Sequence, residues 1–378
     1  MFFIGDPAAA AEPHLYVTTT GSDTQPCTEV APCATVQHAV DLVSPGSQAH
    51  IHVGEGTFEG GVSVGADRTV TIQGIGPGTL LSAMQTGTVV WAGGGLTDVR
   101  LVDLSVGLGS AYRGGGIHNR ATMSLTRVVV AYNLAHEDGG GIFNLGTMAV
   151  TDSTVALNEA RYGSGILNVG QMEIRNTAVR NNTVSGSSGA IEGAGGHLKL
   201  YDSSVVNNVG RRLSPGVGIT MWASDASLDA VHVTVAGNRA LAEEQASGGI
   251  AFQNSSSSSI TGSIIANNSG LNCRLGSSAG LTLRYTLVGD RTCTASQGRD
   301  GGWAPPVEGM INGVDPMLGP LKDNGGPSYT TELLPGSPAI NRIWGADVLC
   351  NGSDQRYVAR RPSGPAWPCD MGAYETQH

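Results

Sequence analysis

Short runs of alternating apolar and polar residues recur through the middle of the chain, and Gly, Asn and Ser lie between them. Examples are Met148 to Val150 and Leu198 to Leu200, where a single different residue separates two apolar ones. Alternation with a period of two is typical of β-strands, and turn-forming residues on both sides keep each strand to about three to five residues. The pattern predicts many short strands separated by turns.

Two motifs repeat in step along this region. The first is an isoleucine after a glycine-rich segment, as in GGGIHN and GGGIFN, and it recurs every 24 to 31 residues at Ile117, Ile142, Ile166, Ile191, Ile219 and Ile250. The second is an asparagine three residues after a Val or Ile, at Asn133, Asn158, Asn182, Asn208, Asn238 and Asn268. The two registers define about seven readable coils.

A repeat of this length cannot bury its apolar side alone, so successive repeats must stack. Each strand would pair in parallel with its counterpart one coil away, and the recurrent asparagines would form a hydrogen-bonded ladder inside a turn. Many β-branched residues and the lack of a 3.6-residue period argue against a helical solenoid. We therefore predict an all-β, right-handed parallel β-helix with a short N-terminal capping helix and an irregular C-terminal capping element.

Composition and charge agree with this prediction and exclude some partners. The chain has 378 residues, 56 of them Gly, with 14% charged residues and a formal net charge of -10. Basic residues never cluster beyond pairs such as Arg211-Arg212, so we expect no nucleic-acid partner. No apolar stretch reaches the roughly 18 residues of a membrane helix, and we expect no membrane span.

The cysteines and the N-terminus indicate a secreted protein. Six cysteines fall into three close pairs, Cys27 with Cys33, Cys273 with Cys293, and Cys350 with Cys369, although six thiols permit about fifteen connectivities. An even number in short loops favours an oxidising compartment. Residues 1–12 have an apolar start and a run of small residues, which we interpret as a disordered segment or the remnant of a signal peptide.

The segment from 15 to 43, with IHVGEGTF (51–58) and VTIQGIG (70–76), resembles the entry segment of the pectate-lyase-like β-helix superfamily. In those proteins an amphipathic helix caps the first coil, and the resemblance implies such a helix from Ala34 to Val43. The superfamily includes polysaccharide lyases, glycoside hydrolases and adhesins, so the resemblance implies a polysaccharide or cell-surface glycan as partner.

The end of the chain resembles a different element. DPMLGPLKDNGGPSYTTELLPGSPAIN (315–341), SDQR (353–356) and CDMGAYE (369–375) are similar to the C-terminal element of secreted bacterial β-helix proteins called choice-of-anchor Q proteins. That family usually has a surface anchor after GAYE, whereas three residues follow here. We expect a β-helix with its N-terminal cap over 13–300 and this C-terminal cap over 301–378.

Stacked coils would bring the loops after the asparagines together on one lateral surface. Glu137 and Glu159 lie one coil apart, which would suit the carboxyl pair of a retaining glycosidase, and Asp138 is an alternative partner. We predict these three as catalytic. The predicted substrate-binding residues are the aromatic and charged neighbours Tyr112, Arg113, His118, Arg161, Tyr162, Glu192, Arg211 and Trp222.

The leading hypothesis is a secreted glycoside hydrolase that cleaves a polysaccharide without a metal or other cofactor. The same acidic trio could instead hold calcium in a polysaccharide lyase, with Arg161, Tyr162 or Lys199 as base. The alternative outside enzymology is a non-catalytic glycan-binding or adhesive protein, in which Arg161 and its acidic neighbours form solvated ion pairs. Asp152, Asp202 and His232 are interpreted as residues of a turn.

Overall fold

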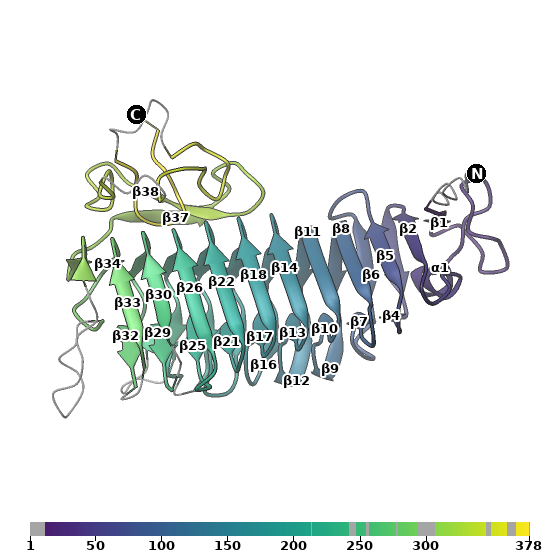
Figure 1. Cartoon of the computed structure of the whole chain (residues 1–378), viewed down its shortest axis with the longest axis horizontal. Helices are drawn as coiled ribbons and strands as arrows, with labels where there is room; N and C mark the ends of the chain where they lie inside the picture. Colours follow the sequence, from purple (N-terminus) through teal and green to yellow (C-terminus); the bar gives the residue numbers. More distant parts are fainter. Residues whose placement is uncertain are drawn as a thin grey trace, which may run out of the picture.

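The chain forms one long stack of β-coils (Figure 1), seen in a computed structural model that describes residues 12–212, 214–241, 247–254, 257–276, 279–293, 307–344, 349–360 and 368–377. Nearly every strand pairs in parallel with the strand one coil before it and one coil after it. The all-β prediction is confirmed, and most strands are as short as the apolar pattern indicates, although β8 (Asp98–Gly107) and β11 (Thr122–Ala131) have ten residues each. Residues 1–11, in the predicted N-terminal segment, lie outside the described residues.

Four columns of strands run along the stack. The first two merge into one sheet, because β8 (Asp98–Gly107) and β11 (Thr122–Ala131) continue through the corner between them. The other strands of the first column are β1 (His14–Val17), β2 (Gln48–Val53), β5 (Thr69–Gln73), β14 (Thr147–Thr151), β18 (Gln171–Arg175), β22 (His197–Tyr201), β26 (Ser227–Val231), β30 (Ser258–Thr261), β33 (Leu281–Arg284) and β35 (Val307–Glu308). Those of the second are β3 (Gly56–Glu59), β6 (Thr79–Ser82), β15 (Thr154–Ala156), β19 (Ala178–Arg180), β23 (Ser204–Val206), β27 (Thr234–Ala236), β31 (Ile264–Ala266), β34 (Leu287–Val288) and β36 (Ile311–Asn312).

The remaining two columns form two further sheets along the stack. The third column comprises β4 (Val62–Val64), β7 (Val90–Ala92), β10 (Ile117–Asn119), β13 (Ile142–Asn144), β17 (Ile166–Asn168), β21 (Ile191–Gly193), β25 (Ile219–Met221), β29 (Ser247–Phe252) and β32 (Leu271–Leu275). The fourth comprises the short strands β9 (Ser110–Arg113), β12 (Leu134–Asp138), β16 (Glu159–Ala160), β20 (Thr183–Val184), β24 (Val209–Gly210) and β28 (Arg239–Ala240).

Apolar side chains of like position stack into continuous columns inside the coils. Ile117 pairs with Ile142, which pairs in turn with Ile166, and all three are completely buried. Each such side chain contributes about 1.5–3 kcal/mol by leaving water, and it does so only because coils lie above and below it. Stacking is therefore the source of stability that an isolated repeat lacks.

The asparagine ladder forms as predicted. From Asn133 to Asn238, each Nδ2 donates to the Oδ1 of the asparagine one coil on, at 3.0 Å from Asn133 to Asn158 and at 2.9 Å from Asn208 to Asn238. The last asparagine, Asn268, donates instead to Asn272. The same Oδ1 also accepts from the backbone N–H of the preceding asparagine, as Asn158 does from Asn133. The ladder thereby satisfies buried backbone groups at a corner where strand pairing stops.

A second turn is built from residues with left-handed backbone. Asp152, Asp202 and His232 have φ values of 56°, 44° and 54°. Asp, Asn and His adopt this conformation more readily than most residues. This agrees with their interpretation as turn residues.

The two ends of the chain differ. Helix α1 (Val36–Asp41) lies at the N-terminal end of the stack, within the predicted range, and the side chain of Thr35 caps it by accepting from the N–H of His38. The C-terminal residues instead pack on the side of the stack (Figure 1), with β37 (Leu318–Lys322) and β38 (Thr330–Leu333) as an antiparallel pair.

Polar contacts join the C-terminal element to several coils. The hydroxyl of Tyr357 donates to Asp152 at 2.6 Å, and Nη2 of the buried Arg360 donates to Asp202 at 2.8 Å. The N–H of Gly372 donates to the carbonyl of Gly262 at 2.7 Å. The element thus lies against the turn of left-handed residues, over coils far apart in sequence from it.

The cysteines form three disulfides among the described residues. Each joins the two partners of a close pair: Cys27 with Cys33, Cys273 with Cys293, and Cys350 with Cys369. In the described part of the chain, no helix is long and apolar enough to cross a membrane.

Candidate active site

The outward side chains of the third column form a stripe along the stack. The central positions of its strands pair in register, so that residues about 25 positions apart become neighbours. From the N-terminal end the stripe runs Ser63, Trp91, His118, Phe143, Leu167, Glu192, Thr220, Ala251 and Arg274. An apolar and aromatic stretch therefore leads to a single carboxylate.

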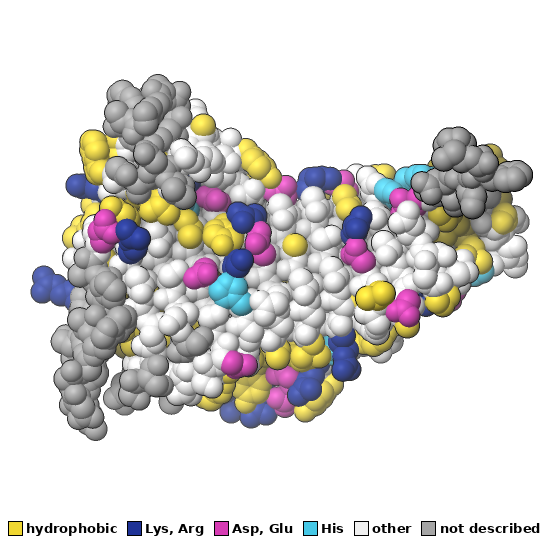
Figure 2. All heavy atoms as spheres, viewed as in Figure 1, with side chains coloured by type: hydrophobic (Ala, Val, Ile, Leu, Met, Phe, Trp, Pro, Cys, Tyr) yellow, Lys and Arg dark blue, Asp and Glu magenta, His cyan; other side chains and the backbone are white. Residues whose placement is uncertain are grey.

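A groove of about 490 Å³ lies over this stripe. Five of the eleven predicted site residues line it: Arg113, Asp138, Tyr162, Glu192 and Trp222. Its other lining residues are Phe143, Leu145, Leu167, Val169, Ser187 and Ala194. Along the lower edge of Figure 2, near β9, β12 and β16, hydrophobic, basic and acidic side chains gather, whereas most of the visible sheet face is neutral.

Glu192 is the most buried carboxylate of the groove, with 7% of the residue exposed. Its Oε2 accepts a hydrogen bond from the hydroxyl of Ser188, four residues earlier in the turn that leads into β21. Burial raises the pKa of Glu192 to about 7, and the negative charge of Asp138 adds to the rise while the Ser188 bond opposes it. Glu192 can therefore hold or release a proton near neutral pH.

Asp138 is the second carboxylate of the groove and ends β12. Nε of Arg113 lies 2.7 Å from its Oδ2, and Arg113 itself lies on the neighbouring coil. Burial raises the pKa of Asp138, and Arg113 acts in the opposite direction. The groove thus holds two carboxylates in different surroundings, one beside a guanidinium and one among apolar neighbours, which is the arrangement that separates an acid from a base.

The other two predicted catalytic residues lie outside the groove lining. Leu134 pairs with Glu159 where β12 lies beside β16, and Asp138 pairs with Tyr162 across the same two coils. Glu137 and Glu159 therefore occupy different positions along their coils. Each glutamate instead binds its own arginine. Nη1 of Arg161 donates to Glu137 at 3.1 Å, and Nη1 of Arg211 donates to Glu159 at 2.8 Å.

Arg161 and Arg211, two of the predicted substrate-binding residues, also lie outside the groove lining. Both guanidinium groups are about half exposed and lie on the outer surface of the loops. Of the ion pairs expected between Arg161 and its acidic neighbours, the pair with Glu137 forms, whereas Glu159 is bound by Arg211 from two coils away. Such exposed pairs contribute little to stability.

The predicted aromatic residues lie around the groove. Trp222 lines it with 50% of the residue exposed, whereas Tyr112 is 64% exposed beside Arg113, whose guanidinium carbon lies 5.7 Å from the Tyr112 ring centre. The Arg161 guanidinium carbon lies 5.2 Å from the ring centre of Tyr162. Exposed aromatic faces next to polar groups are suited to stacking on sugar rings.

His118 belongs to the stripe of outward side chains on the third column. Its ring meets Phe143 edge to face at 5.0 Å, and its Nε2 is buried without a hydrogen-bond partner in the described part of the chain. Burial lowers the pKa of His118, and the charges of Arg120 and Arg113 lower it further. The imidazole is therefore neutral at pH 7 and extends the aromatic floor.

Two residues were not predicted from the sequence. Trp91 lies outside the groove lining but continues the stripe, because it pairs with His118, although no glycine-rich motif precedes it. Ser188 binds Glu192 from within the glycine-rich segment itself. A search for Ser or Thr before the repeat isoleucines could have found Ser188, whereas nothing in the local sequence marks Trp91.

The structure is similar to solved structures of carbohydrate-active enzymes. The pectate lyase Pel9A shares 15% sequence identity over 97% of each chain, with a TM-score of 0.57. The fold is a right-handed parallel β-helix. Weaker similarities include the GH136 lacto-N-biosidase from Eubacterium ramulus, at 12% identity over 79% of this chain and 68% of that one, with a TM-score of 0.38.

A rhamnogalacturonan lyase is also similar, at 11% identity over 86% of this chain and 96% of that one, with a TM-score of 0.34. No protein-family model matches the chain, and no curated protein matches it by sequence. At 15% identity the similarity to Pel9A establishes the fold alone, and a fold does not determine a reaction.

Proposed function

We propose that this protein binds a polysaccharide in the groove over the third strand column and hydrolyses a glycosidic bond there, with Glu192 as general acid and Asp138 as general base. The observation that carries the proposal is the buried Glu192, whose pKa of about 7 keeps a proton available near neutrality beside an apolar and aromatic floor. The similarity to Pel9A supports a carbohydrate ligand.

In this reaction Glu192 donates its proton to the oxygen of the leaving sugar. Asp138, ionised beside Arg113, removes a proton from water as that water attacks the anomeric carbon. After the products leave, Asp138 releases its proton to solvent and Glu192 takes one up from solvent, which restores both groups. Trp222 and Tyr162 would stack on sugar rings on either side of the bond that breaks.

The strand register favours inversion of the anomeric centre. Asp138 precedes β13 and Glu192 lies on β21, and β17 lies between these two strands. Two steps of about 4.8 Å give roughly 9.6 Å of rise between the two backbone positions, about twice the spacing of adjacent strands. We therefore propose that a water molecule lies between the two carboxyl groups. Carboxyl groups of inverting glycosidases lie about 6.5–9.5 Å apart, compared with about 5 Å in retaining enzymes.

The test is product analysis after incubation with a panel of plant and bacterial polysaccharides. Glu192→Gln and Asp138→Asn should each lower kcat by a factor of about 10² to 10⁴ on the substrate that is cleaved. Glu137→Gln and Glu159→Gln are the matched controls and should retain activity within about tenfold, because these carboxylates bind arginines outside the groove lining. Full activity of Glu192→Gln would contradict the assignment.

Two other functions remain proposals with their own outcomes in this experiment. An unsaturated product that absorbs in the ultraviolet would identify a polysaccharide lyase, and loss of that product with a chelator would assign calcium to it. Binding to a polysaccharide without any product would identify a glycan-binding protein. The hydrolase is favoured over the binding protein because a binding site has no need of a carboxylate that burial keeps partly protonated.

We further propose that the protein is secreted and that residues 315–375 form a choice-of-anchor Q type element. The three disulfides are consistent with an oxidising compartment. Fractionation of the source cells, with the protein detected by antibody, tests secretion. Recovery of the reduced protein from the cytosol would contradict it.

A further inference from the structure

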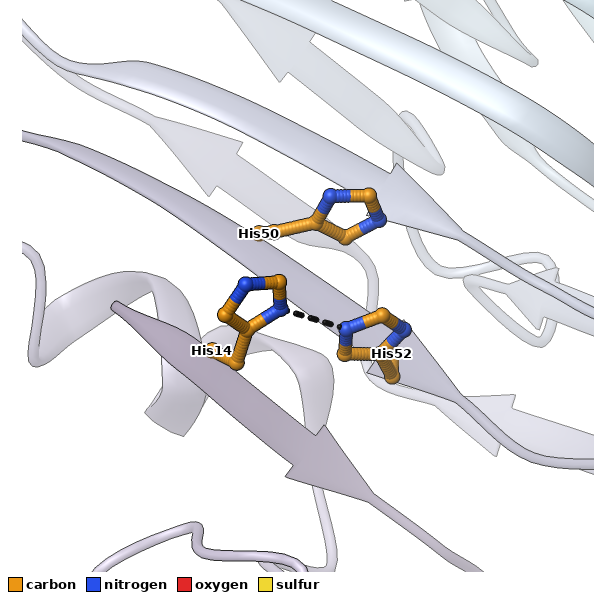
Figure 3. A group of neighbouring side chains, drawn as sticks. All are labelled: His14, His50 and His52. Atoms are coloured by element: carbon orange, nitrogen blue, oxygen red, sulfur yellow. Dashed lines mark hydrogen bonds between the residues drawn. The ribbon is translucent and has the colours of Figure 1, made fainter. Parts of the chain in front are cut away.

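Three histidines meet on the outer face of the first two strands of the stack (Figure 3). His14 lies on β1, while His50 and His52 lie two positions apart on β2 and therefore point to the same side. The parallel pairing of β1 with β2 places His14 beside His50 and Tyr16 beside His52. Strand register alone thus brings three imidazoles together, on a different sheet from the groove.

The ring nitrogens have nearly the spacing of ligands to one metal ion. Nδ1 of His14 lies 2.8 Å from Nε2 of His52, and one nitrogen from each of the three rings lies within 4.8 Å of the others. Zinc binds imidazole nitrogen at about 2.0–2.1 Å, so two nitrogens on a tetrahedral ion are about 3.4 Å apart. Small rotations of the side chains would satisfy that geometry.

Neighbouring groups hold the rings in place. Nε2 of His50 forms a hydrogen bond of 2.7 Å with Oε1 of Gln73 on β5, the next strand of the column. The Tyr16 ring stacks on His52 with centres 4.8 Å apart, and His50 stacks on His52 at 4.4 Å. A polar partner beyond the ligands is a recurrent feature of histidine metal sites, because it orients the ring.

We propose that His14, His50 and His52 form a binding site for one divalent transition-metal ion, of which zinc is the representative, and that the ion ties β1 to β2. Imidazole ligands suit zinc, copper and nickel, and three of them leave one position of a tetrahedral ion for water. His14 is exposed, so the ion can enter from solvent. Its role is structural, since it joins the terminal strand to the rest of the stack.

The described residues contain one other group of three such ligands, Cys27, Cys33 and His38. Its two sulfur atoms are joined in a disulfide, so they are not available as thiolates. Experiments without a reducing agent therefore isolate the histidine site.

The test is isothermal titration of the metal-free full-length protein with zinc chloride, without reducing agent at pH 7.5. We expect one zinc ion per chain and a higher melting temperature with zinc than without it. His50→Ala should weaken zinc binding at least tenfold, and Gln73→Ala should weaken it by about 10-fold to 100-fold by freeing the His50 ring. His197→Ala, which removes a surface histidine of the same column bound to Ser227, is the matched control and should bind zinc as the native protein does.

Circular dichroism of each metal-free variant verifies that it is folded before titration. Zinc binding that is equal in the native protein, His50→Ala and His52→Ala would overturn the proposal, as would the absence of zinc uptake by the native protein. Activity on a polysaccharide does not enter this test, so its outcome is independent of the proposed hydrolysis.

Discussion

Nε of Arg113 lies 2.7 Å from Oδ2 of Asp138, and this ion pair lies beside the groove that Glu192 also lines. The pair joins two neighbouring coils, because Asp138 ends β12 and Arg113 ends β9. The Arg113 guanidinium thus opposes the rise that burial causes in the pKa of Asp138. The pKa of Glu192 is raised by burial among apolar side chains.

Removal of that guanidinium should shift the pH dependence of catalysis. In Arg113→Ala the half-buried Asp138 loses its cationic partner, so its pKa rises further. Because the general base acts when ionised, the acidic limb of the kcat profile should move to higher pH, while the alkaline limb set by Glu192 stays near pH 7. Arg161→Ala is the control, since that arginine binds Glu137, and an acidic limb that moves equally in both variants would contradict this role for Arg113.

Glu192 should also make the protein less stable as the pH rises. Its pKa is raised from 4.5 to about 7 in the folded protein, so ionisation above pH 4.5 favours the unfolded chain until both states are ionised above about pH 7. Glu192→Gln should therefore stabilise the protein by up to about 3 kcal/mol at pH 8 and leave stability unchanged at pH 4. Melting temperatures at both pH values measure this, with the exposed Glu59→Gln as control, and an equal gain at both pH values would argue against the raised pKa.

The asparagine ladder should be sensitive at its centre. Asn182→Ala removes the Oδ1 that accepts from both the N–H and the Nδ2 of Asn158, and it removes the donor to Oδ1 of Asn208. Buried groups then lack partners, which should destabilise the protein by about 2–4 kcal/mol. Thermal unfolding measures the loss. Asn181→Gly, at the adjacent position with a φ of 54°, keeps the backbone conformation and should have a much smaller effect.

Arg360 should hold the C-terminal element on the coils. Its guanidinium is buried and donates to Asp202 and, at 2.9 Å, to the carbonyl of Gly372. Arg360→Ala leaves these acceptors buried and unpaired, which should destabilise the attachment by about 3 kcal/mol or more. Limited proteolysis should then remove the C-terminal element while the coils remain intact. The exposed Arg342→Ala is the control, and identical digestion of both variants would exclude this role.

The coils could be predicted because their information is local and periodic. Ile117 and Ile142 occupy the same position of consecutive repeats, and the pairing of β10 with β13 places them side by side. The asparagine ladder follows from the same periodicity, because each amide meets an identical amide one coil away. In such a repeat, residues that lie one repeat apart in sequence become neighbours in adjacent coils.

The groove was harder to predict because its details depend on register within each coil. Glu137 and Glu159 lie in adjacent coils, yet Glu159 directly follows Asn158 and faces Leu134, whereas Glu137 lies four residues after Asn133, next to Asp138, which faces Tyr162. Glu192 was predicted from the sequence as a substrate-binding residue, whereas its burial and its bond to Ser188 depend on the packing of the surrounding loops. Side-chain contacts of this kind do not recur in every coil, so the sequence repeat does not predict them.

The lateral position of the C-terminal element has a mechanical consequence. A solenoid can unravel from a free end one coil at a time, because each coil contacts only its neighbours. Here the last part of the chain is fastened at Asp152, Asp202 and Gly262, so it spans several coils at once. A pulling force on the C-terminus would load these attachments in shear before any coil could peel away, and the coils between them would yield as one block.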